Sequence, residues 1–453
     1  MIKSLWAKIT GASILQKAAR TTAYTVINFG SSQLIRLLSN LVLTRLLFPE
    51  AFGIMALSGL LLTALSQFSD VGIKTSIIRS ERGEDQVFLD TAWSLKVVRG
   101  VFLFAMAWLL SYPMSILYGD PIFTKIVPMM AIILIVEGLL PTSVDLAYRH
   151  MEMGRLTALE IGANLITVIS MIFFSWLTGD VWGLAYGTVL GAIGKFILFK
   201  IFLPGHGNSF VFERPAMREL LTFGIWIFPS TIATFIAMQS DKFLLGIYVS
   251  LETLGIYNIG YFLASFPLML AQTLGGRVMT SFYRNSPPGE SAANFNRIRK
   301  LIFVAFGGLS VSIIVLVLIG GWLVAFLYDD RYLEAGVMLV TLTSMHILQI
   351  HQIPYQHAVL GLGSSRQYFT LIAVKALAMI SCIWLGLEFF GLLGGIIGQG
   401  VAFVISYPAS LFYAIRMKVW DPLFDIFLFA VAAVITSTAW FLYSDQMQSL
   451  IGY

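Results

Sequence analysis

Hydrophobic residues fall in long runs along this 453-residue chain, and short polar segments separate the runs. Each run has about 20 residues or more, enough for an α-helix to cross a hydrocarbon core of about 30 Å. The pattern predicts thirteen membrane-spanning helices. They cover residues 22–47, 51–69, 92–117, 122–146, 156–178, 181–203, 222–249, 253–276, 301–327, 334–360, 367–389, 391–415 and 422–443.

Basic residues alternate between the predicted loops, and this alternation sets the orientation. With a cytoplasmic N-terminus, the outer loops receive only Arg45, Lys125 and Arg331, while the inner loops receive most of the other Lys and Arg residues. Cytoplasmic loops of membrane proteins carry such an excess of positive charge. We therefore expect a multi-pass protein of the cell inner (plasma) membrane with its N-terminus in the cytoplasm.

The composition agrees with a lipid-embedded chain, since 58% of the residues are hydrophobic and only 12% are charged. Too few polar residues remain to coat a water-facing surface. The net charge of +5 is explained by the inner loops, so we expect no nucleic-acid partner. A single cysteine, Cys382, excludes an intrachain disulfide and a cysteine zinc site. Residues 1–21 mix lysines with apolar positions and predict an amphipathic helix on the cytoplasmic surface.

The two halves of the chain resemble each other. Leu47-Phe-Pro-Glu-Ala-Phe-Gly-Ile54 recurs as Val249-Ser-Leu-Glu-Thr-Leu-Gly-Ile256, at a spacing of roughly 200 residues. Because six spans is an even number, the second half starts on the same side of the membrane as the first. The repeat is therefore parallel, about a pseudo-two-fold axis along the membrane normal.

The fold expected is an all-α polytopic membrane protein built of two six-helix bundles, with an extra C-terminal span. Its expected parts are a cytoplasmic amphipathic helix (1–21), an N-terminal bundle (22–203), a cytoplasmic connector (204–221), a C-terminal bundle (222–415) and an additional span with a tail (416–453). Glycines at helix-packing spacing in spans six and twelve indicate close approach of neighbouring helices.

Charged residues inside the predicted spans are candidates for function, because each costs a few kcal/mol to place in lipid. Arg36, Lys242 and Lys375 form a set of cations that would suit an anionic, phosphate-bearing ligand. The acids Asp241, Glu137 and Asp70 could take a proton and couple movement to an ion gradient. The alternative is ion pairing that only locks the helices together.

Span ten carries a polar cluster, for which three interpretations stay open. The cluster comprises His346, Gln349, His351, Gln352, Gln356 and His357. Metal binding or catalysis is one interpretation, although no carboxylate within the cluster would orient a histidine. A hydrated cavity wall is favoured, in which His346, Gln349, Gln352 and Gln356 contact sugars. Satisfied packing is the third.

Motifs of soluble enzymes are missing from the chain. It has no Walker A sequence, no HExxH and no GxSxG elbow. We therefore expect no enzyme, no catalytic residue, no cofactor and no metal.

Four segments carry a resemblance to a known family. They are Leu46-Leu-Phe-Pro-Glu-Ala-Phe-Gly-Ile54, Ser69-Asp-Val-Gly-Ile-Lys-Thr-Ser76, Leu146-Ala-Tyr-Arg-His-Met151, and Ser240-Asp-Lys-Phe-Leu-Leu-Gly246 followed by Leu254-Gly-Ile-Tyr257. Together they resemble the polysaccharide transporter family of the multidrug/oligosaccharidyl-lipid/polysaccharide (MOP) exporter superfamily. The resemblance runs from about residue 22 to residue 415.

This resemblance implies a twelve-helix core that works by alternating access and flips undecaprenyl-diphosphate-linked oligosaccharides for exopolysaccharide, capsule or O-antigen synthesis. Asp241, Lys242 and Arg149 fall on family-typical positions, and Arg149 joins the expected cationic cleft. The implied partners are the lipid-linked oligosaccharide, membrane lipids and, by analogy, a polysaccharide polymerase and a chain-length regulator. Two alternatives remain: a multidrug or cation exporter of the same superfamily, and a membrane-bound polysaccharide-modifying enzyme.

Overall fold

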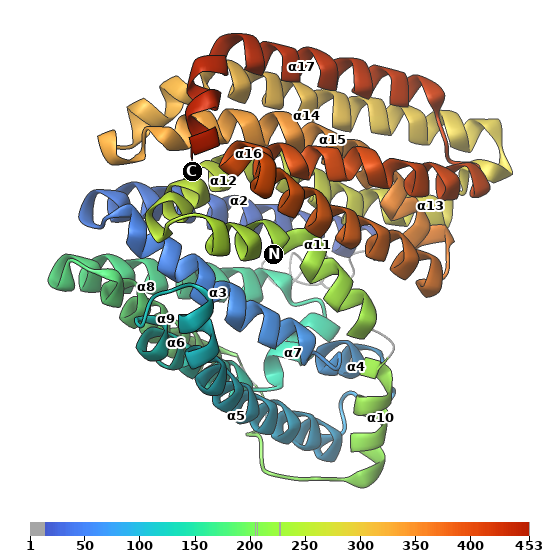
Figure 1. The fold of residues 1–453 in the computed structure, drawn as a ribbon. Helices are drawn as coiled ribbons and strands as arrows, with labels where there is room; N and C mark the ends of the chain where they lie inside the picture. Colours follow the sequence, from blue (N-terminus) through green and yellow to red (C-terminus); the bar gives the residue numbers. More distant parts are fainter. Residues whose placement is uncertain (1–13, 204, 206, 226–227, 453) are drawn as a thin grey trace, which may run out of the picture. The chain divides into compact units, whose positions relative to one another are not determined.

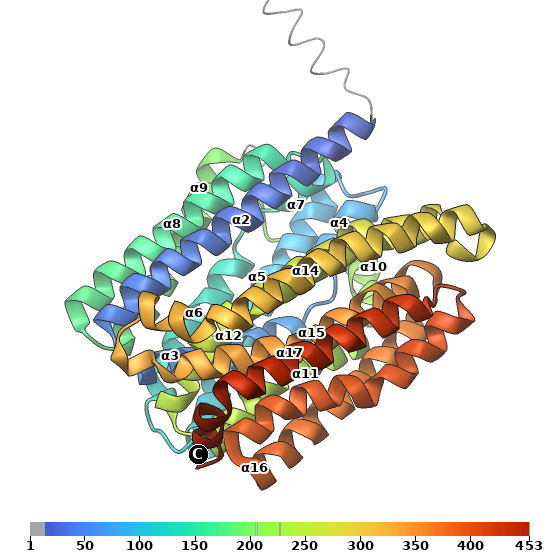
Figure 2. The same ribbon diagram turned by 90° about the horizontal axis from the view of Figure 1, so that it is seen from above.

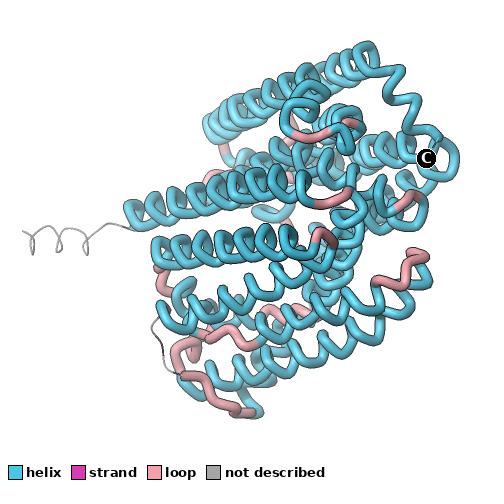
Figure 3. Tube along the Cα trace, turned by 90° about the vertical axis from the view of Figure 1, so that its left-hand side faces the viewer, coloured by secondary structure: helices cyan, strands magenta, loops and turns pink. Residues whose placement is uncertain are grey.

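The computed structural model describes residues 14–203, 205, 207–225 and 228–452 (Figure 1). The regular secondary structure of these residues consists of helices joined by loops, and no strand occurs among them (Figure 3). Nine of the described helices are long and apolar enough to cross a membrane, or ten if one bent pair counts as a single span. Of the amphipathic helix expected at 1–21, residues 1–13 lie outside the described part of the chain.

The chain divides into two compact units, which are described separately here. Unit 1 contains residues 1–47 and 68–228, and unit 2 contains residues 48–67 and 229–453. The helices of unit 1 are α2 (Ile14–Leu46), α4 (Ile73–Arg79), α5 (Gln86–Leu117), α6 (Phe123–Gly138), α7 (Ser143–Arg149), α8 (Met153–Thr178), α9 (Val181–Phe202) and α10 (Arg214–Ile225). Those of unit 2 are α3 (Pro49–Phe68), α11 (Phe228–Tyr248), α12 (Leu251–Leu274), α13 (Thr280–Asn285), α14 (Ala292–Leu327), α15 (Glu334–Leu362), α16 (Ser365–Arg416) and α17 (Pro422–Ser449).

Each of the thirteen predicted spans coincides with helix in the described residues. Two of them, 367–389 and 391–415, form the single 52-residue helix α16, which reverses at Phe390 and Gly391. Gly391 has a φ of +56°, a conformation that favours glycine. On either side of the reversal, Gly386 and Gly394 lie so close that a Cβ on one would overlap the carbonyl of the other. The glycines thus let two spans meet without a loop.

The predicted span 122–146 is a broken helix, α6 and α7, bent by 61°. Pro141 lies in the break and has no N–H to continue the helix. The carbonyls freed there take donors from α5: Trp93 Nε1 lies 3.3 Å from the oxygen of Leu139, and Lys96 Nζ lies 3.2 Å from that of Leu140. Side chains therefore replace the backbone bonds that a span cannot leave unmade in lipid.

The segment expected as a connector packs against unit 1. Asp90 of α5 accepts a hydrogen bond from the backbone N–H of Ser209 at 3.1 Å, and Ser94 Oγ accepts one from Val211 at 3.0 Å. Helix α10 follows and buries Ala216 and Leu220 in an apolar cluster with residues of α4 and α5. The connector is therefore part of the folded unit in these residues.

Helix α3 precedes α4 in the sequence, yet it belongs to unit 2. The expected bundle 22–203 groups it with its sequence neighbours, and this bundle stays a prediction; in the structure α3 contacts α12. Gly53 on α3 and Gly255 on α12 occupy equivalent positions in the internal repeat. A Cβ on either glycine would overlap a backbone carbonyl of the opposite helix, Leu251 or Pro49. Small residues allow this approach where lipid offers no hydrophobic drive between helices.

We expect Gly53→Ala to destabilise the protein, because the added methyl group has no space against the backbone of α12. Overpacking of this kind costs about 1–3 kcal/mol. Gly59→Ala is a matched control on the same helix, since a Cβ there meets nothing within 4 Å. Thermal unfolding in detergent measures both variants. Equal midpoints for the two would contradict the close contact of α3 with α12.

Candidate functional site

Helix α15 is the central helix of unit 2. It contacts α12, α14, α16 and α17, which run alongside it (Figures 1 and 2). In its membrane-spanning window 72% of the residues are buried inside the protein. The polar cluster predicted in span ten lies on this helix, so its side chains face other helices.

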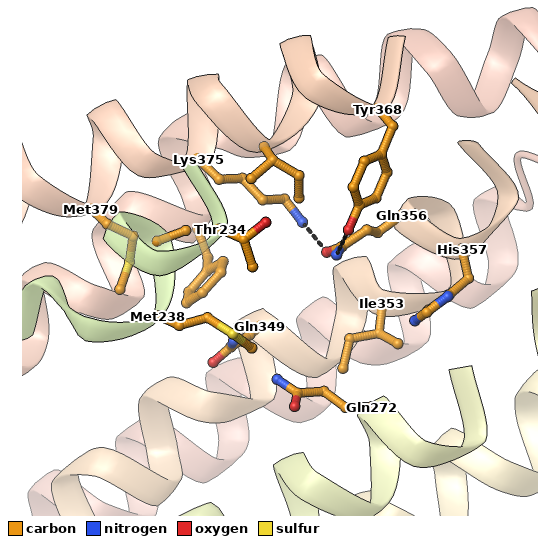
Figure 4. Close-up of a pocket in the computed structure, with 13 residues that line it drawn as sticks. Thr234, Met238, Gln272, Gln349, Ile353, Gln356, His357, Tyr368, Lys375 and Met379 are labelled. Atoms are coloured by element: carbon orange, nitrogen blue, oxygen red, sulfur yellow. Dashed lines mark hydrogen bonds between the residues drawn. The ribbon is translucent and has the colours of Figure 1, made fainter. Parts of the chain in front are cut away.

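A cavity of about 230 Å³ lies within unit 2, between α11, α12, α15 and α16 (Figure 4). Its volume is below the roughly 300–1,000 Å³ typical of sites that enclose a whole drug-sized ligand. It is lined by Thr234, Ala237, Met238, Gln272, Gln349, Ile353, Gln356, His357, Tyr368, Ile372, Lys375, Met379 and Phe403. Amides, hydroxyls and one ammonium group thus meet apolar side chains, a combination that suits one part of a larger polar ligand.

Lys375, Gln356 and Tyr368 form the polar wall of the cavity. The Lys375 ammonium donates to Gln356 Oε1 at 3.1 Å, and Gln356 Nε2 donates to the Tyr368 hydroxyl at 3.4 Å (Figure 4). Lys375 is only 5% exposed. Its partner is a neutral amide, and no carboxylate is among the described residues that line the cavity. A buried charge held this way is costly unless a counter-charge arrives, so the cavity suits an anionic group.

An irregular stretch of backbone lies beside two of the lining residues, Gln272 and His357. Helix α12 ends one residue before a π-helical turn, Gly275–Met279, and Gln272 of α12 lines the cavity. His357 Nδ1 lies 2.9 Å from the Thr280 hydroxyl just beyond this turn. A Cβ on Gly275 would overlap the His357 ring. Glycine therefore permits His357 to reach Thr280, and π turns of this kind are frequent at functional sites.

A second polar cluster in unit 2 surrounds Asp241 of α11, which is 3% exposed. The Tyr257 hydroxyl donates to Asp241 Oδ2 at 2.8 Å, and Gln399 Nε2 donates to Tyr257 at 3.1 Å. Asp241 Oδ1 has no hydrogen-bond partner in the described part of the chain. The carboxylate therefore keeps one free acceptor in a buried position.

His346 supplies a second free acceptor. Its Nδ1 lies 3.1 Å from the carbonyl oxygen of Ala264, which can only accept, so Nδ1 carries the proton. Nε2 is then a buried acceptor, and it too lacks a partner among the described residues. His346 lies within electrostatic reach of Asp241. Two buried acceptors without donors suit a proton or a small cation.

The remaining predicted residues of unit 2 lie outside the cavity. Gln352 bonds at both amide ends to α16, where Nε2 reaches the Phe403 carbonyl and Oε1 accepts from Ser410 at 3.0 Å. The Lys242 ammonium lies 5.0 Å from the ring centre of Tyr261. Gln352 thus joins two helices, and Lys242 faces an aromatic ring.

Arg149, expected in the cationic cleft, lies at the end of a helix in unit 1. Its guanidinium donates to the carbonyls of Ile77 at 2.8 Å, Ile78 at 3.1 Å and Ser80 at 2.7 Å, at the C-terminus of α4. Positive charge is favourable at this end of a helix. A hydrogen bond with His150 holds the pKa of Glu84 below its usual value, and the charge of Arg149 lowers it further. In this structure Arg149 therefore stabilises the loop after α4.

Three other predicted residues also belong to unit 1. Arg36 lies on α2 with an exposed side chain. Glu137 and Asp70 lie within electrostatic reach of Arg99, whose Nε donates to Ser69 Oγ at 2.9 Å. Of the four cations proposed for ligand binding, Lys375 alone is among the described residues that line the cavity.

Sequence reasoning missed several polar residues. Thr234, Gln272 and Tyr368 line the cavity, but none of them carries a charge that would signal a role within a predicted span. Glu160 of α8 is different, because a charge within a predicted span is a signal. Its carboxylate accepts from the Tyr148 hydroxyl at 2.8 Å and also bonds to Asn28.

A helical membrane bundle with a cavity that has polar groups in its lining is compatible with a membrane transporter. Residues 42–335 match the model of a family described as "Polysaccharide biosynthesis protein", and the chain belongs to this family. The resemblance found in the sequence motifs is thereby confirmed.

Two characterised proteins are similar to this chain in sequence. The chain is 20% identical over 369 residues to the teichuronic acid biosynthesis protein TuaB of Bacillus subtilis, covering 77% of this chain and 75% of that protein. It is 21% identical over 388 residues to the lipopolysaccharide biosynthesis protein WzxC of Escherichia coli, covering 83% of this chain and 76% of that protein.

Solved structures with the same fold are multidrug resistance MATE family transporters of the MOP superfamily. An inward-facing structure matches with a TM-score of 0.64 at 14% identity, over 85% of this chain and 94% of that one. An outward-facing structure matches with a TM-score of 0.61 at 15% identity, over 89% and 96%. The fold is therefore that of this transporter superfamily, as expected from the sequence.

We expect Lys375→Met to unfold at a temperature equal to or above that of the wild type. The substitution keeps the length of the side chain and removes a buried charge that has only a neutral partner. Residues that serve function often reduce stability in this way. Thermal unfolding in detergent is the measurement. A marked loss of stability would mean instead that the ammonium group holds the fold together.

Proposed function

We propose that the protein is a flippase that moves undecaprenyl-diphosphate-linked oligosaccharide repeat units from the cytoplasmic to the outer leaflet of the inner membrane. The observation that carries this proposal is the buried Lys375 ammonium in a cavity otherwise lined by amides, hydroxyls and apolar groups. Amides and hydroxyls suit sugars, and the ammonium suits an anionic group of the ligand. The family and the names of its characterised relatives support a polysaccharide precursor as cargo.

The cavity is small for a whole repeat unit, so it would hold one part of the headgroup at a time. The polyprenyl chain would stay in lipid while the polar headgroup crosses within the protein. Alternating access, a cytoplasmic N-terminus and a plasma-membrane location complete the proposal, supported by the MATE-like fold and by the distribution of basic loops.

A multidrug or cation exporter is the alternative within the same superfamily. An acidic side chain in the binding cavity would favour a cationic drug. Among the described lining residues the charged side chain is instead a base, Lys375. The buried acid Asp241 does not line the cavity. The charge of the cavity therefore favours an anionic cargo.

We expect a deletion strain to accumulate the lipid-linked repeat unit in the cytoplasmic leaflet. Wild-type protein would clear it, and Lys375→Met would clear it about tenfold more slowly or worse, since a hydrogen bond to a charged group contributes about 1.5–3 kcal/mol. Leaflet-specific labelling of the repeat unit in spheroplasts measures the clearance.

Lys125→Met is the matched control, because Lys125 is exposed in the first turn of α6, away from the cavity, and its loss should leave clearance unchanged. If nothing accumulates in the deletion strain, the flippase proposal is wrong. If Lys375→Met clears as fast as the wild type, the cargo does not use this ammonium.

We further propose that Asp241 and His346 form the site of the coupling ion. The support is their two buried acceptor atoms without donors, Oδ1 and Nε2, in one cluster with Tyr257. Binding of a proton or a sodium ion at Asp241 would give Oδ1 a partner and change the charge in the interior of unit 2, to which His346 responds electrostatically.

In proteoliposomes, we expect an imposed proton or sodium gradient to accelerate flipping by the wild type. Asp241→Asn should lose this acceleration, because a neutral amide cannot bind the proton or sodium ion as the carboxylate would. Asp120→Asn, which changes an acid outside the helices, should respond like the wild type. An unchanged response of Asp241→Asn to both gradients would place the coupling site elsewhere.

A further inference from the structure

Asp425 lies in the first turn of α17, the helix that follows the two expected bundles, and it is 6% exposed. Its carboxylate accepts hydrogen bonds from His351 Nε2 at 2.7 Å, from the Tyr355 hydroxyl at 2.6 Å and from Trp420 Nε1 at 2.7 Å, and it also bonds to the Tyr407 hydroxyl. Four donors converge on one buried group. None of them faces the cavity, so ligand binding does not explain them.

Two of these donors lie on either side of a proline in α15. Pro354 lies inside α15 and has no N–H, so the carbonyl of Ile350 loses its partner within the helix. Helices bend most readily at such a position. His351 precedes Pro354 and Tyr355 follows it, and both donate to the same atom, Asp425 Oδ1. One carboxylate oxygen therefore bridges the interruption in the backbone bonding.

The imidazole of His351 is also fixed by its surroundings. It stacks on Tyr407 with ring centres 5.3 Å apart and an interplanar angle of 26°. The ring of Phe429, on α17, meets it edge-on at 4.5 Å, and Phe424 lies at 5.8 Å. The ring cannot slide along α17 without losing these contacts, so the bridge has one geometry.

The cavity residues of α15 span the same proline. Gln349 and Ile353 precede it, and Gln356 and His357 follow it. Gln356 is the residue that holds the Lys375 ammonium. Any change in the bend at Pro354 moves Gln356 relative to Gln349. It therefore changes the spacing of these two amides in the cavity wall.

We propose that Asp425 is a positioning residue: by bonding across Pro354 it fixes the bend of α15 and so the geometry of the cavity. The role of the cavity in binding cargo rests on the proposed function, whereas the bend can be measured without any cargo. The additional helix α17 thus acts on the cavity from the opposite face of α15.

A double-mutant cycle tests this inference. Asp425→Asn weakens the bridge, and Pro354→Ala restores the missing N–H so that the bridge is no longer needed. Asp421→Asn is the matched control, because the Asp421 side chain caps α17 through the N–H of Leu423 and pairs with Arg299 at 2.9 Å, and only its backbone, which the substitution keeps, contacts Tyr355 of α15. Tyr355→Phe removes one donor and keeps the ring, as a milder variant should Asp425→Asn fold poorly.

The first measurement is the distance between spin labels at Glu334→Cys and Leu360→Cys, which are exposed near the two ends of α15. The background is Cys382→Ser, since Cys382 is the only cysteine of the chain. We expect Asp425→Asn to broaden or shift the distance distribution, and Tyr355→Phe to do so less. In the Pro354→Ala background the same Asp425→Asn change should have no effect, and Asp421→Asn should resemble the wild type.

The second measurement is the dependence of flipping rate on the concentration of lipid-linked oligosaccharide in proteoliposomes. We expect Asp425→Asn to raise the half-saturating concentration about tenfold with a smaller change in maximal rate, because the ligand contacts are displaced. A purely structural defect would lower the amount of active protein, and so only the maximal rate.

The outcomes separate the two proposals. An unaltered distance in Asp425→Asn, or an equal effect in both proline backgrounds, overturns the positioning role and leaves Asp425 as an anchor for α17. An altered bend with unaltered flipping supports the bridge across Pro354 and overturns the assignment of the cavity to cargo.

Discussion

A polar group inside lipid has to find its hydrogen-bond partner within the protein, and the structure of unit 2 depends on this constraint. Helix α15 carries most of the polar groups and distributes them among its neighbours. His346 bonds to α12, His351 to α17 and Gln352 to the second arm of α16, while Gln356 reaches its first arm and His357 reaches α13. Each bond goes to a different helix or helical arm, so together they fix the depth and the rotation of α15. The cavity lies where this pairing leaves a positive charge without a counter-charge.

Hydropathy predicted the helices well, because the thickness of the membrane dictates their length and lipid dictates their surface. It could not predict which unit a helix joins. The hydrophobicity of α3 is that of an ordinary second span. Its place in unit 2 accompanies the backbone contact at Gly53, which a hydrophobicity pattern does not encode. The connector shows the same limit, because its polar sequence indicates a segment that joins the two halves but not that Asp90 and Ser94 bind its backbone along α5.

For the site, the sequence indicated Lys375, Gln349 and Gln356, since charge and amides in a span are rare enough to be noticed. It gave no means of telling which polar residues of span ten face the cavity and which face another helix. That distinction depends on rotation by a few tens of degrees, as Gln352 and Gln356 show on one helix. Arg149 shows a related limit: a cation next to a membrane helix serves equally well for a ligand's anion and for the carbonyls at a helix end, which it contacts in this structure.

Helix α3 also bears on how a protein of this kind could have arisen. If the repeat reflects duplication of a six-span ancestor, that ancestor had to bury the equivalent of α3 without the partner it has now. A half-length chain can do so by pairing this helix with the same helix of a second copy, so that the glycine equivalent to Gly53 and Gly255 meets its own counterpart. Fusion of two such chains would make this pairing permanent, and it would account for an α3 that packs on its own repeat equivalent, α12.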